Sequence, residues 1–191
     1  MVWISLDLYL LRHGDVGKSL VSGGTSDMAL TESAKKEIAI VARSIKTLNL
    51  QITAILTSPL KHATQTAKIL SKALGMESKI SVCNELAPEG SSAKLSEKLL
   101  RYPLNSSILI VGHKPYLSDL MYEIIYYENR HQMKRTSVMR KQAIAELSRG
   151  IFLKKAGFAK IRLVSLTPTM RGEIRWLMTP RILKLLQCSQ R

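Results

Sequence analysis

Three short apolar runs in this chain each lead into a histidine. The three pairs are Leu6–Leu11 with His13, Ile52–Thr57 with His62, and Ile108–Val111 with His113. Runs that stay apolar without alternation are typical of strands buried on both faces of a sheet. In α/β proteins, ligands bind beyond the carboxyl ends of such strands. We therefore expect the three histidines to lie along one rim of a central sheet.

Helical patterns separate these runs. Caps and breakers favour one helix from Thr31 to about Leu48 and a second that starts at Ser58-Pro59 and stops at Gly75. Further helices are expected at Ala93–Tyr102, from Pro115 to Ile125, and from Thr179-Pro180 to about Leu186. Further strands are expected at Lys79–Cys83, Ala143–Leu147, Lys160–Leu166 and Glu173–Leu177, the last three more antiparallel in character. This alternation predicts an α/β fold of three layers, α/β/α, around a mostly parallel central sheet.

The length and the cysteine count indicate a simple organisation. A chain of 191 residues is most simply one domain. Its two cysteines, Cys83 and Cys188, are too few for a disulfide framework, and they fit a reducing cytoplasm. The apolar N-terminus is short, lacks basic residues and is interrupted by Asp7, so we expect no signal peptide. Because no run approaches the roughly 18 apolar residues of a membrane helix, we expect a cytoplasmic protein without membrane contact.

The net charge of +15 is concentrated in the last third of the chain. Residues 1–129 hold 14 basic and 12 acidic residues, a net charge of +2, and residues 130–191 hold 15 and 2, a net charge of +13. This asymmetry favours either a basic face for an acidic protein partner or polyanion, or an ordinary solvated surface. No aromatic residues are interleaved with the cations and no nucleic-acid motif is present, so nucleic acid is not the expected partner.

Three histidines on one rim could bind either a metal ion or an anion. Zinc would need a fourth ligand, and no acid or cysteine is suitably spaced to supply it. Arg12, beside His13, would repel a cation, and its guanidinium is a donor fork that suits phosphate. The start of the helix after Ser58 adds free N–H groups and a positive dipole end to the same rim. The pattern therefore predicts an anion site without a metal.

The motifs of the chain resemble those of the histidine phosphatase superfamily, and most closely its short SixA-type branch of phosphohistidine phosphatases. These motifs are Leu11-Arg12-His13-Gly14-Asp15, Thr57-Ser58-Pro59-Leu60 with Ala63, Gln65 and Thr66, Glu85-Leu86-Ala87-Pro88, Val111-Gly112-His113, and Trp176 with Thr179-Pro180. The resemblance spans about residues 7 to 186. It implies a phosphoglycerate-mutase-like fold and one histidine phosphatase-like domain over residues 1–191, with a basic insertion at about 129–141.

The resemblance also implies a role for each site residue. His13 would be the nucleophile that takes the phosphoryl group on an imidazole nitrogen. Arg12 would hold phosphoryl oxygens, and His113 would donate a further hydrogen bond. Glu85 lies in a loop where larger relatives carry an acid, although an ordinary surface carboxylate explains it equally well. A phosphohistidine substrate would need little help from an acid, because imidazole is a good leaving group. No cofactor and no metal is implied.

One position departs from the family pattern. The resemblance implies an arginine in a Ser-Pro-x-x-Arg-Ala pattern, and His62 stands in its place. A histidine of ordinary pKa, about 6.5, carries charge only when it is protonated. Each charge-assisted hydrogen bond lost would remove about 1.5–3 kcal/mol. Lys61 or a cation from residues 130–141 could fill the gap, although Lys61 is about 100° further around the helix.

Two functions follow from these patterns. The first is a metal-independent phosphatase with a phosphohistidine intermediate, which acts on protein phosphohistidine or another phosphomonoester. Its catalytic residues would be His13, Arg12, His113 and Glu85, and its substrate-binding residues Arg12, His62 and His113. The second is a catalytically weak phosphate-binding module that docks an acidic protein partner through the basic C-terminal third.

Overall fold

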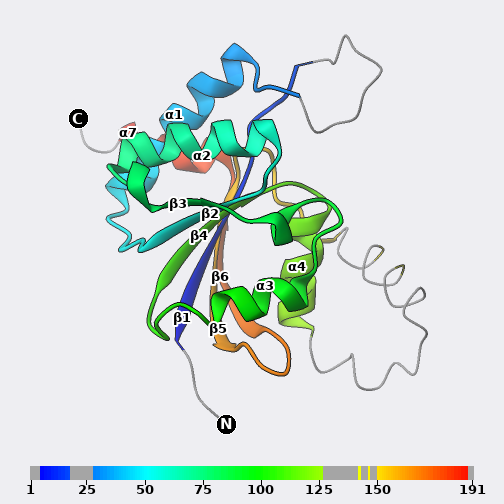
Figure 1. The fold of residues 1–191 in the computed structure, drawn as a ribbon. Helices are drawn as coiled ribbons and strands as arrows, with labels where there is room; N and C mark the ends of the chain where they lie inside the picture. Colours follow the sequence, from blue (N-terminus) through cyan, green and yellow to red (C-terminus); the bar gives the residue numbers. More distant parts are fainter. Residues whose placement is uncertain (1–4, 18–27, 127–141, 143–145, 147–149, 189–191) are drawn as a thin grey trace.

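A six-stranded sheet forms the centre of the molecule (Figure 1). The computed structural model describes residues 5–17, 28–126, 142, 146 and 150–188. The strands are β1 (Leu6–Arg12), β2 (Ala54–Thr57), β3 (Ile80–Val82), β4 (Ser107–Gly112), β5 (Phe158–Ser165) and β6 (Arg171–Met178). Their order across the sheet is β3-β2-β4-β1-β5-β6. The first four are parallel, whereas β5 runs antiparallel to both β1 and β6. The expected α/β fold is confirmed, and the sheet is parallel over one part only.

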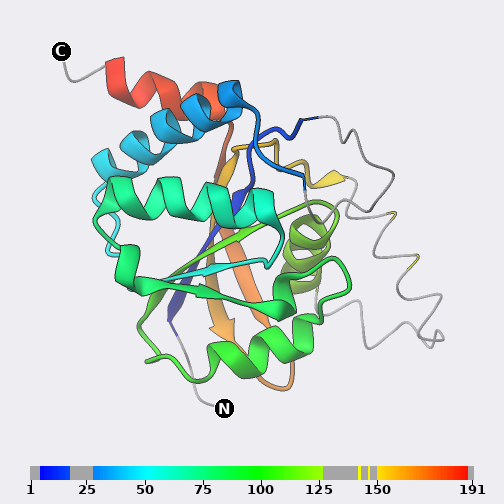
Figure 2. The same cartoon turned by 45° about the horizontal axis from the view of Figure 1, so that its top comes forward.

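Helices cover both faces of this sheet, as Figures 1 and 2 show. The helices are α1 (Glu32–Thr47), α2 (Lys61–Leu74), α3 (Ser92–Leu99), α4 (Tyr116–Ile125) and α7 (Pro180–Cys188), and η2 (Glu77–Lys79) and η3 (Asn84–Leu86) are short 3-10 turns. One apolar core joins the sheet to α1, α2 and α7, and the other joins it to α3 and α4. The three expected layers are therefore present.

The central strands β1 and β4 are largely apolar because both of their faces are covered. In β1, Leu8 and Leu10 pack toward α3 and α4, whereas Tyr9 and Leu11 pack toward α1, α2 and α7. β4, which pairs with β1 on one side and β2 on the other, alternates in the same way. This central position of β1 and β4 fixes the rim at which both strands end.

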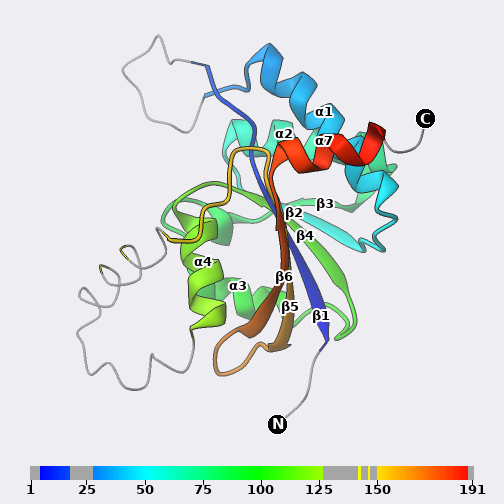
Figure 3. The same ribbon diagram turned by 180° about the vertical axis from the view of Figure 1, so that it is seen from behind.

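The outer strand β6 has a different character (Figure 3). It is the last strand of the sheet among the described residues, and the middle of it, Glu173 to Arg175, is exposed. Glu173 and Arg175 form an ion pair of 3.0 Å. The pairing of β6 with β5 is interrupted by two register shifts, so this edge is both charged and irregular. The other edge strand, β3, has three residues.

Several expected boundaries hold, and others are displaced by two or three residues. Thr31 caps α1 by accepting from the N–H of Ala34, and Gly75 ends α2 with φ of 68°. Ser58-Pro59, however, does not start α2, which begins at Lys61. The reason is that the N–H of Ser58 donates to the carbonyl of Val111 at 2.9 Å and so continues the β2–β4 ladder by one residue. The other helices and strands begin and end within three residues of the expected limits.

Two expectations concern segments that the structure does not describe. The basic insertion at about 129–141 lies outside the described residues. The strand expected at Ala143–Leu147 lies there too, except for Glu146, whose backbone is helical rather than extended. In the described part of the chain, no helix is both long enough and apolar enough to cross a membrane.

Candidate active site

Three buried histidines gather where β1, β2 and β4 end. His13 directly follows β1, His113 directly follows β4, and His62 lies in the first turn of α2, after β2. The ring centroids of His13 and His62 are 4.2 Å apart, and those of His62 and His113 are 6.5 Å apart. The residues are 7%, 4% and 5% exposed, in chain order. The rim therefore holds a compact cluster of imidazoles with His62 in its middle.

Backbone hydrogen bonds hold the cluster together. The N–H of His13 donates to the carbonyl of Gly112 at 2.9 Å, which carries the β1–β4 ladder one residue beyond the strand. The hydroxyl of Thr66 accepts from the N–H of Gly14 at 3.3 Å and donates to the carbonyl of His62 at 2.8 Å. Thr66 thus ties the turn after β1 to the first turn of α2, and with it His13 to His62.

Gly14 is required here by close packing. A Cβ at this position would lie 3.1 Å from Cγ1 of Ile38 and 3.2 Å from both the Ala34 Cβ and the Leu30 Cδ2 atoms. The chain can therefore turn beneath His13 against α1 only where no side chain intervenes.

The hydrogen bond of His13 defines its reactive nitrogen. Its Nδ1 lies 2.6 Å from the carbonyl oxygen of Gly14. A carbonyl can only accept, so Nδ1 carries the proton and Nε2 keeps the free lone pair of the neutral ring. Burial first, and then the neighbouring His62, lower the pKa of His13 to about 3. His13 is therefore neutral at pH 7, with Nε2 available as a nucleophile.

Several buried polar atoms near the histidines have no hydrogen-bond partner among the described residues. Arg12 donates from Nη1 to the carbonyl of Leu153 at 3.0 Å, but its Nε finds no partner in the part of the chain that the structure describes. The same holds, over these residues, for both ring nitrogens of His113 and the hydroxyl of Tyr116. Buried polar atoms of this kind normally have a hydrogen-bond partner. Their grouping at one rim indicates a place for a polar ligand.

Burial favours the uncharged forms of the polar groups at the rim. Burial lowers the pKa of the Arg12 guanidinium, while Asp15 opposes this effect. Burial, followed by His62, lowers the pKa of His113 to about 4. In the ligand-free protein at pH 7, the site therefore presents one fixed cation and neutral imidazoles, an arrangement suited to an oxyanion.

His62 points into the cluster, and its neighbour Lys61 does not. Lys61 is exposed, whereas His62 is buried. The Nδ1 of His62 lies 3.3 Å from the carbonyl oxygen of Met28, so the neutral ring is protonated there and its Nε2 can only accept. Burial lowers the pKa of His62. In the position expected for an arginine, the protein thus has a group that donates toward the cluster only after it gains a proton.

Glu85 is held among other side chains. Its Oε2 accepts from the thiol of Cys83 at 3.1 Å and from Nζ of Lys98 at 3.3 Å. Hydrogen bonds, first from its own backbone and then from Cys83, lower the pKa of Glu85. Burial raises the pKa of the Cys83 thiol to about 11, so the thiol keeps its proton and remains a donor. Glu85 is consequently an ionised carboxylate at neutral pH.

Glu89 is a carboxylate that the sequence reasoning missed. It lies in the loop after Pro88, which is closed by a bond from the N–H of Gly90 to the carbonyl of Ala87 at 2.8 Å. Its charge raises the pKa of His113 against the larger effect of burial. No motif marks this glutamate, and only the folding of the loop reveals its influence on the site.

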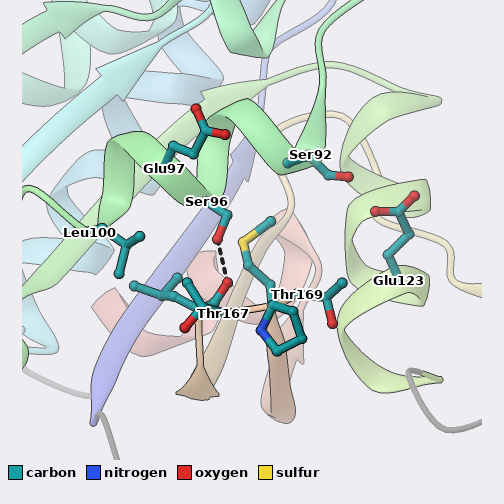
Figure 4. Close-up of a pocket in the computed structure, with 11 residues that line it drawn as sticks. Ser92, Ser96, Glu97, Leu100, Glu123, Thr167 and Thr169 are labelled. Atoms are coloured by element: carbon teal, nitrogen blue, oxygen red, sulfur yellow. Dashed lines mark hydrogen bonds between the residues drawn. The ribbon is translucent and has the colours of Figure 1, made fainter. Parts of the chain in front are cut away.

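Among the described residues, two pockets lie outside the cluster of histidines. One, of about 820 Å³, includes Arg12 in its wall and is otherwise formed mainly by residues of the basic C-terminal third. The other, of about 200 Å³, lies between α3, α4 and the β5–β6 turn, at the opposite end of β1 (Figure 4). A hydrogen bond of 2.6 Å from Ser96 to the carbonyl of Leu166 joins α3 to that turn. Among the described residues, no group of three or more His, Cys, Asp or Glu side chains is arranged to hold a metal ion.

Comparisons with known proteins support the family and the fold of this chain. The family model of the histidine phosphatase superfamily (branch 1) matches residues 8–87, which contain His13 and His62. An uncharacterised protein from a Picosynechococcus species is 32% identical over 67% of this chain and 78% of its own length. The phosphohistidine phosphatase SixA from Escherichia coli is 28% identical over 77% of this chain and 91% of its own length. A solved structure of the protein histidine phosphatase SixA complexed with tungstate shares the fold, with a TM-score of 0.70, 24% identity, and coverage of 93% of this chain and 99% of that one.

Proposed function

The chain belongs to the histidine phosphatase superfamily, and we propose that it is a phosphatase that carries the phosphoryl group on Nε2 of His13. Its similarity to this superfamily supports phosphatase activity in general. The observation that carries the proposal is the hydrogen bond from Nδ1 of His13 to the carbonyl of Gly14, which leaves Nε2 unprotonated within the buried cluster. A neutral imidazole needs no separate base in order to attack phosphorus.

The proposed reaction has two displacements. In the first, the Nε2 lone pair of His13 forms a bond to phosphorus, and the bond to the leaving group breaks with its electron pair. In the second, water attacks the phosphorus of phospho-His13 and the P–Nε2 bond breaks. This step releases inorganic phosphate, returns the lone pair to Nε2, and passes the proton of the water to solvent. Dividing one displacement into two lowers the barrier of each.

Arg12 and His113 would stabilise the phosphoryl oxygens. The partnerless Nε of Arg12 is a fixed donor with positive charge, and a neutral His113 has one N–H to donate. Both groups are already in place and buried, so they need little reorganisation when charge builds up on the phosphoryl group. His62 would add a third donor when it is protonated, and the negative charge of the bound phosphoryl group favours that proton.

Glu85 has a restricted part in this proposal. A carboxylate with a lowered pKa holds no proton at neutral pH, so it cannot act as an acid until it leaves Lys98 and gains one. A phosphohistidine substrate avoids this requirement because imidazole is a better leaving group than an alkoxide. Protein phosphohistidine is therefore the substrate that the proposed site suits best, and phosphomonoesters with good leaving groups come next.

The test compares labelling and turnover. Wild-type protein and His13→Ala are incubated with a phosphohistidine-containing protein and, separately, with p-nitrophenyl phosphate, with and without EDTA. We expect an acid-labile, base-stable phosphoryl label and turnover in the wild-type protein, both lost in His13→Ala and both unaffected by EDTA. Equal labelling of the two proteins would remove His13 as the nucleophile. Binding of phosphate without turnover of either substrate would favour a phosphate-binding module instead.

A further inference from the structure

A basic pocket adjoins the proposed phosphoryl site. We use this term for the pocket of about 820 Å³ whose wall includes Arg12. Its other cations are Lys114, Lys154, Lys155, Arg181 and Lys184. They come from the segment after β4, from the segment before β5, and from α7. Four of the five belong to the C-terminal third, which carries a net charge of +13.

Only part of this charge is neutralised locally. Lys155 pairs with Asp15, and Lys184 pairs with Glu37 at 2.9 Å. Lys114, Lys154 and Arg181 have no ion pair within the described part of the chain. Lys154 and Arg181 are exposed, and the Nζ of Lys114 lies 4.9 Å from the centre of the Phe152 ring. The pocket therefore presents a surplus of positive charge to solvent.

The same pocket has an apolar lining. Phe152 is 53% exposed and Leu185 is 60% exposed, and Pro180, the first residue of α7, belongs to the same lining. Large side chains with this exposure, placed among cations, are typical of a surface that binds a partner. A simple ion or a sugar phosphate would leave these apolar groups in water. A polypeptide that carries both acidic and apolar side chains would satisfy both parts of the lining.

Arg12 connects the pocket to the cluster of histidines. It is the last residue of β1, immediately before His13, and it also forms part of the pocket wall. Its Nη1 donates to the carbonyl of Leu153, in the segment that carries Phe152, Lys154 and Lys155. A ligand with its phosphoryl group on His13 could therefore continue directly into the pocket.

We propose that this basic pocket docks an acidic and apolar polypeptide segment next to the phosphorylated residue of a protein substrate. The proposal rests on the proposed function, and it assigns specificity to residues outside the catalytic cluster. The cations would bind Asp or Glu side chains, and Phe152 and Leu185 would contact apolar ones. Since the docking residues do not touch the phosphoryl group, they would raise the affinity for protein substrates without changing the chemistry on small ones.

The test uses two chemically phosphorylated peptides with one phosphohistidine each. Asp, Glu and Leu flank the phosphohistidine in one peptide, and Ser and Gly flank it in the other. The variant is Lys154→Glu with Arg181→Glu. The control, Lys94→Glu with Arg101→Glu, makes the same change of charge at exposed positions on and just after α3, away from the pocket.

We expect the variant to lose roughly tenfold or more in kcat/KM for the acidic peptide, because two favourable charge pairs become repulsive. Its turnover of the neutral peptide and of p-nitrophenyl phosphate should stay within about twofold. The control should stay near wild type on all three substrates. Raising NaCl from about 50 to about 500 mM should reduce the preference of the wild-type protein for the acidic peptide. An unchanged preference in the variant, or an equal loss in the control, would overturn the docking proposal.

A binding measurement separates this proposal from the proposed function. The unphosphorylated acidic peptide, labelled with a fluorophore, is titrated with the wild-type protein, His13→Ala and the pocket variant. Binding to the first two but not to the third supports docking even if no substrate is turned over. Turnover of all substrates without any binding of this peptide contradicts docking and leaves the phosphatase intact. A short single-stranded RNA that displaces the peptide and binds more tightly would identify a nucleic-acid groove, and the proposal would be wrong.

Discussion

His13 lies among two other imidazoles and an arginine, and these neighbours favour its neutral form. Burial is the largest cause of its low pKa, and His62, Arg12 and His113 add to it, whereas the bond to Gly14 opposes it. A nucleophilic imidazole must be unprotonated, so this environment favours reactivity over a wide range of pH. Burial also disfavours the protonated form of His62, the only form that could donate to a phosphoryl group in the proposed site. A higher pH therefore favours the nucleophilic form of His13, whereas a lower pH favours the donating form of His62.

The first prediction concerns His62→Arg. Since the pKa of His62 is lowered, its contribution to kcat/KM exists only on the acidic side and declines as pH rises through that pKa. An arginine stays charged and should raise kcat/KM at pH 7 to 8 by roughly tenfold, which corresponds to about 1.4 kcal/mol. His62→Ala should fall below wild type on the acidic side. The measurement is the pH profile of all three proteins, and identical profiles would mean that His62 does not contact the phosphoryl group.

The second prediction concerns Glu85→Gln. Because the carboxylate is already ionised and bound to Cys83 and Lys98, its loss should change phosphohistidine turnover by less than about threefold. An alkyl phosphate, which needs a proton on its leaving oxygen, should be affected more. The assay compares both substrates with Glu85→Gln and Glu89→Gln. A large loss of phosphohistidine turnover in Glu85→Gln would contradict this prediction and indicate that Glu85 acts as a catalytic acid.

At the level of the elements, α1 and α2 contact the turn after β1 through small residues that a larger side chain could not replace. Gly14 packs against Ile38 of α1, and Thr66 of α2 joins the turn at Gly14 to His62. The apolar stripes of both helices determine how they sit on the sheet, and this packing sets the distance between the two imidazoles. The geometry of the site is therefore a result of helix packing rather than of local sequence.

The third prediction is that Gly14→Ala will reduce both stability and activity. Its methyl group would come within 3.2 Å of three side chains, and overpacking of this kind costs about 1–3 kcal/mol. The matched control is Gly17→Ala, where a Cβ has no neighbour within 4 Å among the residues that the structure describes. Urea denaturation and turnover of p-nitrophenyl phosphate are measured on both. If Gly14→Ala and Gly17→Ala had the same stability and the same turnover, the side chains around Gly14 could move enough to accept a methyl group.

The elements that could be predicted from sequence are those with a strong local signal. β1 and β4 are continuous apolar runs, and Thr31 and Gly75 are clear cap residues, so their positions were close to correct. The start of α2 was not, because the N–H of Ser58 bonds to Val111 of β4, which lies 53 residues further along the chain. The ion pair of Glu85 could not be predicted either, since Lys98 reaches this carboxylate only when α3 packs beside η3. The position of the three histidines on one rim could be predicted, because it depends only on the parallel order of β1, β2 and β4. The tautomer of His13 could not, because it depends on the conformation of the turn at Gly14.

On the scale of the whole molecule, the buried imidazoles link folding to pH. In the unfolded chain these imidazoles would have the ordinary pKa of about 6.5. In the folded protein, burial lowers the pKa of His13 to about 3 and that of His113 to about 4. The folded state therefore binds fewer protons below pH 6.5, and stability is lost as pH falls from there toward these values. Above pH 6.5 these histidines are neutral in both states, so they no longer make the stability depend on pH.

The fourth prediction follows from this linkage. The free energy of unfolding of the wild-type protein should fall steeply between pH 6.5 and 4, and His113→Asn should fall less steeply. Removing one titrating group should reduce the slope by up to about 1.4 kcal/mol per pH unit. Urea denaturation at several pH values measures the slope, and a saturating oxyanion should be absent because it would stabilise protonated histidine. Parallel slopes in both proteins would mean that His113 can be protonated without unfolding.

The charged and irregular edge at β6 bears on how the protein behaves at high concentration. An exposed strand with free backbone groups is a template on which a second chain can add, and charges and breaks in register oppose such growth. Glu173 and Arg175 stand at the middle of that edge, and the opposite edge, β3, is too short to recruit a neighbour effectively. Replacing both charges with valine should therefore lead to light scattering and fibrillar aggregates on gentle heating. The same replacement of the exposed Lys68 and Lys72 on α2 should not, because a helix offers no free ladder. A folded sheet that does not add further strands at its edges leaves the rim with the three histidines accessible to other molecules.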